Sequence, residues 1–283
     1  MTLRSTLPHD HDWHLHTTLS DGFAAPEDVV RQAATLGLHS IAITDHDCLD
    51  AHRGGVLARL GATLGVQVVV GAELDCSVGE QETEVLAYHF DPESSGLVAH
   101  LLGVQEQRRE RFRFYCYGMA AAGHPIDPEA VIHCGARVLI KVHFYRALQA
   151  AGVSFEGGYK GYKAALADLG APPPVAKPPL DQVVALVREA GGTAVLAHPL
   201  YYREDIGLET LLRAGAAAGC AGVELVYPYR FGAKGLGLSV VRPGLAELEQ
   251  LVPRFFPDDP LLTRGTDMHD PTEWQGRLEE LGG

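Results

Sequence analysis

Short, continuously apolar runs alternate with longer stretches of helical periodicity over the first third of the chain. Ile41-Ala42-Ile43 and Val68-Val69-Val70 are apolar at every position, which is typical of parallel strands buried on both faces. The stretch 26–36 predicts a helix, because its opening proline and the two acidic residues behind it suit a helical first turn. The pattern predicts strands at 13–15, 40–44, 67–70 and 83–88, and helices at 26–36 and 49–64.

A different pattern occupies the middle of the chain. Between 93 and 179 the alternation stops, and we expect only helices, at 97–122, 128–134, 142–151 and 159–169. The following stretch 171–179 contains five prolines, which remove backbone donors and force an extended connector. Alternation then resumes, with helices at 180–190, 204–219 and 244–251 and strands at 193–197, 223–226 and 261–266. We therefore expect one domain built from 1–92 and 180–283, with 93–179 as a helical insertion that caps the active site.

Seven strands linked by crossover helices predict an α/β fold. A closed or nearly closed β/α barrel is favoured, with functional residues collected at the carboxyl ends of the strands. A doubly wound open sheet is the alternative, but such a sheet would gather its ligands at a single switch point.

Composition narrows the class of protein. The 283 residues carry a formal net charge of −13 with scattered basic residues, so binding to long duplex nucleic acid is not expected. The five cysteines form no C-x-x-C pair, no apolar run reaches the ~20 residues that span a bilayer, and the first residues lack a signal-peptide core. These features predict a cytoplasmic protein without membrane association.

Metal-type side chains recur at or just beyond the strand-like runs. In an extended segment His14 and His16 point to the same face, and the same holds for Asp267 and His269. Neutral imidazole and carboxylate are common ligands of zinc-like and manganese-like ions. The placement predicts a polynuclear metal site from residues that share this position, namely His14, His16, Asp21, Asp45, His46, Glu73, His198, Asp267 and His269.

Six short segments that contain these residues resemble, in order and spacing, the motifs of the PHP (polymerase and histidinol phosphatase) superfamily. They are Asp12-Trp13-His14-Leu15-His16, Ser20-Asp21-Gly22, Thr44-Asp45-His46-Asp47, Gly71-Ala72-Glu73, Ala197-His198-Pro199 and Gly265-Thr266-Asp267-Met268-His269. The likeness is strongest to stand-alone bacterial members that act on nucleoside 3′,5′-bisphosphates or trim short RNA from its 5′ end. It implies a distorted (β/α)7 barrel with two or three divalent ions, manganese first, with zinc or iron as alternatives.

The resemblance also implies how the ligands are shared. One ion would be held by His14, His16, Glu73 and Asp267, and a third by Asp21, His46 and His269. Glu73 would bridge to a second ion that His143 and His198 complete. The place of His143 rests on Lys141-Val142-His143-Phe144-Tyr145-Arg146, which is similar to a family segment that opens a helix of the insertion.

The chain departs from the family pattern at several positions. Lys141 stands where relatives often have arginine, and Leu200-Tyr201 replaces a Gly-Arg pair. Lys141 is expected to orient a phosphate; Arg203 either reaches inward as a replacement or lies in solvent. Relatives often carry histidine in place of Glu84, for which His89 either compensates or faces solvent. Asp45 is expected to orient His46 through a hydrogen bond.

These observations predict a metal-dependent phosphoesterase that acts on a small phosphorylated substrate. A nucleoside 3′,5′-bisphosphate or a 5′-phosphorylated short oligonucleotide is the favoured substrate, attacked by metal-bound hydroxide, with Glu73 and Asp267 as catalytic residues. Three alternatives remain open: a histidinol-phosphatase-like enzyme, an amidohydrolase-type hydrolase on the same fold, and a non-catalytic metal-binding module. An intact ligand set argues against the last of these, because a structural site needs no open coordination position.

Overall fold

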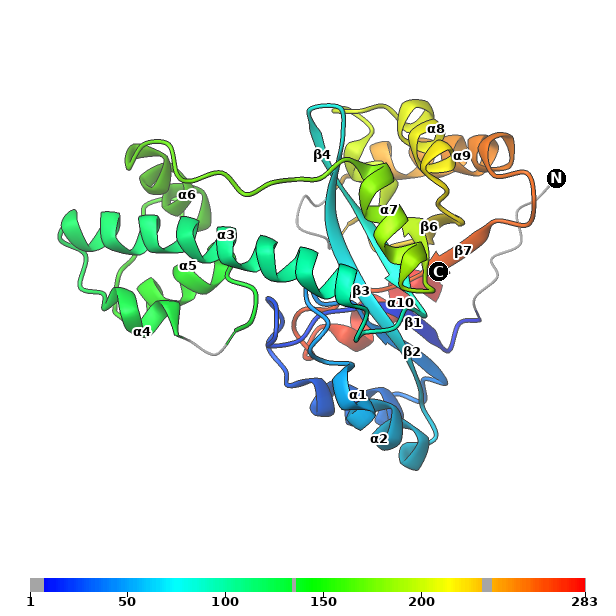
Figure 1. The fold of residues 1–283 in the computed structure, drawn as a ribbon, viewed down its shortest axis with the longest axis horizontal. Helices are drawn as coiled ribbons and strands as arrows, with labels where there is room; N and C mark the ends of the chain where they lie inside the picture. The colour runs from blue at the N-terminus through cyan, green and yellow to red at the C-terminus, as the bar shows by residue number, and fades with distance from the viewer. Residues whose placement is uncertain (1–7, 134–135, 231–235, 283) are drawn as a thin grey trace.

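The computed structural model describes residues 8–133, 136–230 and 236–282. Seven strands form one sheet in the order in which they occur in the chain. The strands are β1 (His11–Leu15), β2 (Ser40–Ile43), β3 (Gln67–Val78), β4 (Gln81–Tyr88), β5 (Thr193–Leu196), β6 (Gly222–Val226) and β7 (Leu261–Arg264). Helices pack around the sheet (Figure 1). At one end lie α1 (Pro26–Thr35) and α2 (Val56–Leu64), and at the other lie α7 (Leu180–Glu189), α8 (Leu208–Ala218) and α9 (Leu238–Phe255).

The sheet closes into a barrel. The chain just beyond β1 meets the chain just beyond β7, where the amide of His16 donates to the carbonyl of Met268 at 2.9 Å. Gly265 permits this approach, because a Cβ at that position would lie 2.2 Å from the Cβ of His14. Buried side chains from five neighbouring strands fill the interior, and these are Trp13, Ala42, Val69, Leu86, Tyr88, Val195 and Ala197. The predicted β/α barrel is confirmed, and the open-sheet alternative is not.

The strands β3 and β4 distort the barrel. The sequence predicts a short strand at 67–70, but β3 continues to Val78 and forms an antiparallel hairpin with β4. Because β4 is also antiparallel to β5, it is the reversed strand in an otherwise parallel sheet. The prediction of seven parallel strands is therefore wrong in this respect. The cause is the tight turn at Gly79 (φ 61°), which leaves no room for a crossover helix.

The helices of the barrel follow the apolar pattern with shifts at their ends. The predicted helix at 49–64 begins only at Val56, because Gly54 and Gly55 adopt positive φ. The helix predicted at 244–251 is longer at both ends and includes Pro243 and Pro253. A final helix after β7 was not predicted. The barrel helices are α1 (Pro26–Thr35), α2 (Val56–Leu64), α7 (Leu180–Glu189), α8 (Leu208–Ala218), α9 (Leu238–Phe255) and α10 (Trp274–Gly282), with 3-10 turns η1 (Arg53–Gly55) and η2 (Pro199–Tyr202).

The insertion consists of α3 (Ser95–Ala121), α4 (Pro128–Ile132), α5 (Lys141–Ala150) and α6 (Tyr159–Asp168). Its far part has a hydrophobic core of its own, centred on Phe112, Phe144 and Tyr162. Figure 1 shows α3 running from the barrel to the outer end of this lobe and the proline-rich connector returning as an extended segment to α7. Leu97 and Leu101, near the start of α3, belong to the main barrel core, so a single rigid helix ties the two parts together.

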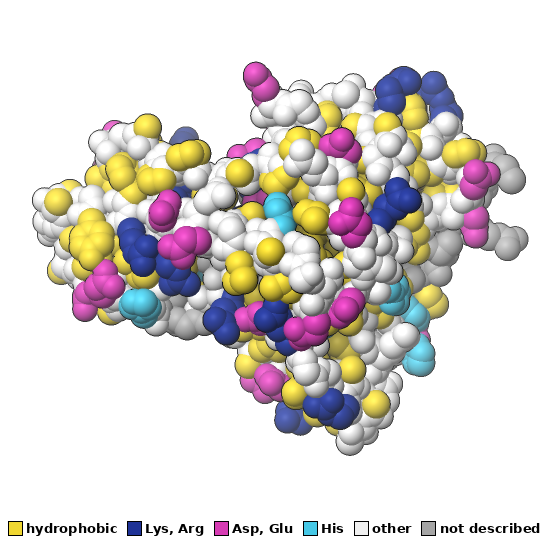
Figure 2. Space-filling model, in the orientation of Figure 1, with side chains coloured by type: hydrophobic (Ala, Val, Ile, Leu, Met, Phe, Trp, Pro, Cys, Tyr) yellow, Lys and Arg dark blue, Asp and Glu magenta, His cyan; other side chains and the backbone are white. Residues whose placement is uncertain are grey.

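Charge is mixed on the surface of the molecule. On the face shown in Figure 2, the Lys and Arg side chains of the insertion are interspersed with Asp and Glu.

Within the described ranges, no helix combines the length and the apolarity needed to cross a bilayer. Cys48, Cys76, Cys116 and Cys220 are buried, and Cys134 lies outside the described residues.

Candidate metal centre

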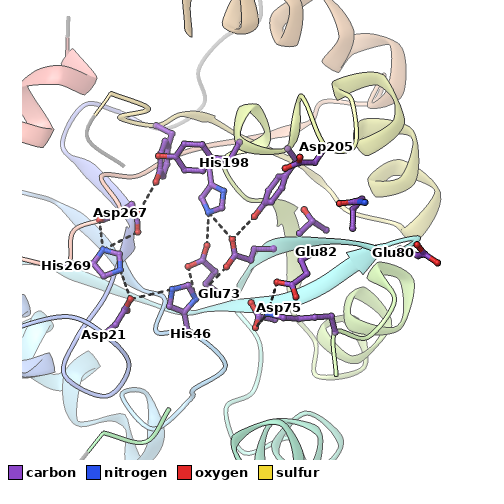
Figure 3. A pocket seen from close by; sticks show the side chains of 17 residues that line it. Asp21, His46, Glu73, Asp75, Glu80, Glu82, His198, Asp205, Asp267 and His269 are labelled. Atoms are coloured by element: carbon purple, nitrogen blue, oxygen red, sulfur yellow. Dashed lines mark hydrogen bonds and ion pairs between the residues drawn. The ribbon is translucent and has the colours of Figure 1, made fainter. Parts of the chain in front are cut away.

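The barrel brings together imidazoles and carboxylates from residues far apart in the sequence. Most lie at or just beyond the carboxyl ends of strands: His14 and His16 at β1, His46 after β2, and Asp267 with His269 after β7. Glu73 lies inside β3, beyond the stretch that pairs with β2. Figure 3 shows the rings of His46, His198 and His269 directed at the same acidic space around Glu73, Asp21 and Asp267. Residues on this rim of a barrel are where catalytic groups collect.

The tightest group consists of His14, His16, Glu73 and Asp267. The Oε2 atom of Glu73 lies 3.3 Å from Nε2 of both histidines. The Oδ1 atom of Asp267 lies 3.1 Å from Nε2 of His16 and 3.5 Å from Nε2 of His14. Four ligand atoms held about 2.1 Å from one ion in a tetrahedron are about 3.4 Å apart. The spacing of these atoms therefore fits a single divalent ion.

The hydrogen-bonding state of the rings supports the same conclusion. Nε2 of His14 and both ring nitrogens of His16 are buried and make no hydrogen bond. Buried polar atoms nearly always have a partner, so atoms without one mark a missing group. Nitrogen lone pairs beside carboxylate oxygens are the donor set that a divalent cation accepts. The residues present fit a resident metal ion.

A second group forms around Glu84. The other oxygen of Glu73, Oε1, lies 2.8 Å from Nε2 of His198, and Oε2 of Glu84 lies 3.5 Å from the same nitrogen. Nδ1 of His46 lies 3.2 Å from Glu73 and 3.9 Å from Glu84. The two oxygens of Glu73 thus face different histidines, which is the arrangement of a bridging carboxylate. Glu84 itself faces the cluster, whereas His89 is exposed beside Trp13.

His143 does not join this second group in the described structure. It is the third residue of α5, where its Nδ1 accepts a hydrogen bond from the backbone amide of Ile140. It lines a separate hollow near Gly22 and Arg146. The expected pairing of His143 with His198 is therefore not made, because α5 approaches the barrel beside the loop at 18–22 and the ring is used to cap its own helix. Glu84, and not His143, lies beside His198 and Glu73 in this group.

A third group contains Asp21, His46 and His269. Nε2 of His269 lies 3.0 Å from Oδ2 of Asp21, and Nε2 of His46 lies 3.9 Å from the same oxygen. Nδ1 of His16 lies 3.6 Å from Oδ1 of Asp21, so His16 connects this group with the first. The structure thus brings together the residues expected for a third ion.

Mutual proximity perturbs the ionisation of these groups. Burial opposes the charged imidazole of His14, but Glu224, Glu73 and Asp267 outweigh it and raise its pKa well above the usual range. Burial likewise opposes the charged carboxylate of Glu73, yet His14 and His46 hold its pKa well below the usual range. The pKa of Glu84 is raised, first by burial and then by the charge of Glu73. A cation between these carboxylates would relieve that repulsion.

Backbone strain accompanies the ligand positions. His198 (φ 25°) and Asp267 (φ 51°) adopt positive φ, which costs free energy for residues other than glycine. Such strain persists where the surrounding structure holds a side chain in place, and it clusters at functional sites.

Several residues around the ligands were missed from the sequence. Glu224 is fully buried in β6; its Oε1 lies 2.9 Å from Nδ1 of His14, and its Oε2 accepts a hydrogen bond from the amide of His198. Because Nδ1 of His14 faces Glu224, its Nε2 faces the cluster. Histidines that ligate a metal commonly contact a carboxylate through their other ring nitrogen in this way. The sequence feature that could have revealed Glu224 is its position as a lone glutamate in the apolar run Val223-Glu224-Leu225-Val226.

Asp45 has a different role from the one expected. Its carboxylate accepts hydrogen bonds from the amide and hydroxyl of Thr17 and from the hydroxyl of Ser20, at 2.6–2.7 Å. Asp45 therefore shapes the turn that leads to Asp21, and the prediction that it orients His46 has no contact to support it. Asp12 plays a similar part for the opposite segment, accepting from Thr266 and from the indole of Trp274.

Glu224→Gln provides a test of the orienting contact. The amide keeps the shape of the side chain but places an NH2 group against either the His14 ring or the amide of His198. We expect metal affinity to fall about 10- to 100-fold, as for other partners of ligating histidines, with the fold retained. Metal titration of chelator-treated protein measures the affinity, and exposed Glu249→Gln is the matched control. Equal affinities in the two variants would exclude an orienting role.

A buried ion network ties the insertion to the ligands. Arg108 of α3 donates to Oδ2 of Asp47, at 2.7 Å from Nη2, and to Asp75. Lys177 of the connector also pairs with Asp75. Asp47 follows His46 and adopts φ 44°, and its amide donates to the carbonyl of Glu73. The Arg108 side chain therefore lies against the strand ends and not in solvent.

The cluster opens into a cavity of about 450 Å³. Its further wall combines Tyr201, Tyr202 and Tyr227 with acidic side chains of the β3–β4 hairpin and its surroundings, including Glu80, Glu82 and Asp205, and with Lys177. The hydroxyl of Tyr227 donates to Oδ2 of Asp267 at 2.6 Å, and that of Tyr202 donates to Glu84 at 2.5 Å. Tyr227 thus holds the oxygen of Asp267 that does not face His14 and His16, and Tyr202 holds the Glu84 oxygen that also faces His198.

The two predicted substrate residues lie in different surroundings. Lys141, at the start of α5, lines a neighbouring cavity together with Asp21. Arg203 follows η2 and donates through Nε and Nη2 to Glu247 of α9, at 3.2 and 2.9 Å. The structure therefore does not bring Arg203 to the cluster, because Glu247 already engages its guanidinium group.

Comparison with known proteins places this geometry in a family. Residues 12–123 match the PHP domain. The chain is 31% identical over 225 residues to a 3′,5′-nucleoside bisphosphate phosphatase of Chromobacterium violaceum, covering 76% of this chain and 75% of that protein. It is 30% identical to a phosphoribosyl 1,2-cyclic phosphate 1,2-diphosphodiesterase of Eggerthella lenta, covering 77% of this chain and 82% of that protein.

The fold agrees with this relationship. A crystal structure from Bifidobacterium adolescentis, provisionally described as a metal-dependent phosphoesterase, superimposes with a TM-score of 0.72 and 27% identity, covering 92% of this chain and 87% of that one. Sequence motifs, fold and converging ligands lead to the same family. The chain belongs to the PHP family of metal-dependent phosphoesterases.

Proposed function

We propose that this phosphoesterase hydrolyses a small phosphorylated nucleotide, with a nucleoside 3′,5′-bisphosphate as the first candidate and a 5′-phosphorylated short oligonucleotide as the second. The observation that carries the proposal is the position of Lys141 in a cavity that shares Asp21 with the metal cluster. A substrate with one phosphate at the cluster could place a second phosphate beside the amine of Lys141 in this cavity. The similarity to a nucleoside bisphosphate phosphatase supports the same substrate class.

The ligands would be shared among two or three divalent ions. We propose His14, His16, Glu73 and Asp267 for one ion, Glu73, Glu84 and His198 for another, and Asp21, His46 and His269 for the third. When bound, the ions supply Lewis-acid activation of water and neutralise charge on the phosphoryl oxygens. A donor set of imidazoles and carboxylates without thiolate suits manganese, with zinc and iron as alternatives.

The side chains around the cluster have separate parts in this proposal. Glu73 would serve as a ligand to two ions, because its two oxygens face different histidines. Asp267 presents Oδ1 to the cluster, since Tyr227 engages Oδ2, so Oδ1 would be its ligand atom. The amine of Lys141 orients an anionic group of the substrate.

A second candidate follows from the acidic wall of the larger cavity. Glu80, Glu82 and Asp205 lie beyond Glu84 on the side of the β3–β4 hairpin. Carboxylates in this position favour a substrate with a protonated amine, as in histidinol phosphate. A phosphate ester of an amino alcohol therefore competes with the nucleotide as the natural substrate.

A substrate panel separates these candidates. Metal-free protein reloaded with manganese is assayed, by phosphate release and product chromatography, on adenosine 3′,5′-bisphosphate, a 5′-phosphorylated dinucleotide, histidinol phosphate and p-nitrophenyl phosphate. We expect kcat/KM for the bisphosphate to exceed that for p-nitrophenyl phosphate by on the order of 100-fold, because a second charge-assisted contact adds about 1.5–3 kcal/mol. A preference for histidinol phosphate would identify the phosphate ester of an amino alcohol, and not a nucleotide, as the substrate. Turnover of an added N-acyl amide, with no cleavage of any of these phosphate esters, would indicate an amidohydrolase.

The third alternative, a non-catalytic metal-binding module, is tested with the same preparation. Stoichiometric manganese with no turnover of any member of the panel, including esters of unrelated alcohols, would favour it. Metal content is measured by elemental analysis on the sample used for the assay.

A further inference from the structure

A cavity of about 300 Å³ lies between the insertion and the metal cluster. Its walls come from α3, from the segment leading into α5, from the start of α6 and from the proline-rich connector. Asp21, the carboxylate shared with the third ligand group, lies at its inner end. The volume is at the lower end of the ~300–1,000 Å³ range typical of small-ligand sites. A molecule bound at the cluster can therefore extend into this cavity.

The cavity has cationic groups that are not neutralised within the protein. Arg108 is already paired with Asp47 and Asp75. Arg111 uses Nε to donate to the carbonyl of Pro173, which leaves both terminal nitrogens of the guanidinium group for another acceptor. Among the described residues, no carboxylate lies within ion-pair distance of Arg111 or Lys141, although several neighbouring arginines and lysines have such partners. The free positive charges favour an anionic ligand.

The same cavity has an aromatic and apolar wall. Phe112 and Tyr115 are almost fully buried beneath it, and Val175 of the connector closes one side. Tyr159 at the first position of α6 is 40% exposed, although its ring packs against Tyr145 and Tyr162. A fixed aromatic ring that remains exposed at the edge of a cavity provides a surface on which a nucleobase stacks.

We propose that this cavity binds the nucleoside 5′-phosphate portion of the substrate. The base stacks on Tyr159, Lys141 and Arg111 bind the 5′-phosphate, and the 3′-phosphate that is hydrolysed lies at the metal cluster. The inference rests on the proposed nucleotide phosphatase function and extends it, since it assigns the part of the molecule that is retained in the product. It also distinguishes this cavity from the acidic one, where Lys177, the lysine among the described lining residues, is already paired with Asp75.

Binding of the product and its fragments tests the assignment. Calorimetry with manganese-loaded protein measures the dissociation constants of adenosine 5′-monophosphate, ribose 5-phosphate and adenosine. Tyr159→Ala is expected to weaken the binding of adenosine 5′-monophosphate and of adenosine about tenfold or more, the usual loss for a stacked base. The binding of ribose 5-phosphate should be unchanged. Lys141→Met is expected to weaken both phosphates by about tenfold without affecting adenosine, because it removes a charge-assisted contact.

Two matched variants control for general effects of the substitutions. Lys160→Met removes the neighbouring amine of α6, and Tyr117→Ala removes an exposed ring of α3 outside the cavity wall. Both should retain the parental dissociation constants. Equal weakening of all three ligands by Tyr159→Ala and Lys141→Met, or no weakening at all, would overturn the assignment.

The outcome is separable from the proposed function. Hydrolysis of adenosine 3′,5′-bisphosphate with unchanged binding in both cavity variants would overturn the cavity assignment and leave the function intact. Selective loss of adenosine 5′-monophosphate binding without any phosphatase activity would support the cavity as a nucleotide site and contradict the proposed reaction.

Discussion

Glu73→Gln is expected to lose at least one bound ion per chain and about 10³-fold in turnover. Oε2 of Glu73 faces His14, His16 and His46, while Oε1 faces His198, so this carboxylate is common to two ligand groups. A carboxamide has one neutral acceptor oxygen and cannot join two cations. Loss of several kcal/mol of charge stabilisation corresponds to the expected drop in rate, at 1.36 kcal/mol for each factor of ten.

Elemental analysis after dialysis measures the ion content, and phosphate release from the best ester of the panel measures turnover. Glu93→Gln makes the same chemical change at an exposed residue before α3 and should retain both properties. Circular dichroism shows whether the Glu73 variant keeps its fold. Unchanged ion content and unchanged turnover in a folded Glu73→Gln protein would refute the bridging role.

Arg108→Met is expected to lower the free energy of unfolding by about 3–5 kcal/mol, the usual cost of removing one partner from a buried ion pair. The substitution leaves Asp47 and Asp75, both buried, with only Lys177 as a cation. Those carboxylates follow His46 and Glu73 closely in the chain, so their repulsion is transmitted to the cluster. We therefore expect weaker metal binding together with the loss of stability.

Urea denaturation at a fixed manganese concentration measures the effect, because bound metal itself contributes to stability. Arg113→Met on the same helix is the control; its side chain is 44% exposed and pairs only at 3.5 Å with Glu106. That variant should lose less than about 1 kcal/mol, as exposed pairs do. If Arg108→Met were as stable as Arg113→Met, the network would have no structural role.

In the proposed function, the acidic cavity and the basic cavity beside the cluster would offer two ways to recognise an ester. Asp21 belongs to both walls, so a phosphate at the cluster has access to each. In the proposed nucleotide reaction the insertion contributes Lys141, Arg111 and Tyr159, while the hairpin of β3 and β4 contributes carboxylates. Exchanging the insertion would then change the substrate while leaving the ligands in place.

Sequence reasoning was most successful where a pattern is local. Apolar runs located the strands, and ligand-type residues at their ends predicted a cluster. The family resemblance supplied the barrel and the phosphoesterase class, both of which the comparisons confirm. It was least successful where a contact depends on how separate elements meet: the placement of His143, the partner of Arg203 and the direction of β4 could not be derived from spacing along the chain.

The sequence by itself determined the buried parallel strands, the helical insertion with its proline-rich connector, and a chemistry of imidazoles and carboxylates. These properties depend on hydrophobic periodicity and residue type, which are readable within a few turns or strands. Only the tertiary structure decided that Glu84 and not His143 stands beside His198, that Glu224 orients His14, and that Arg108 lies against Asp47 and Asp75. Each of these contacts joins residues that lie far apart in the sequence, and packing of whole elements fixes which side chains meet.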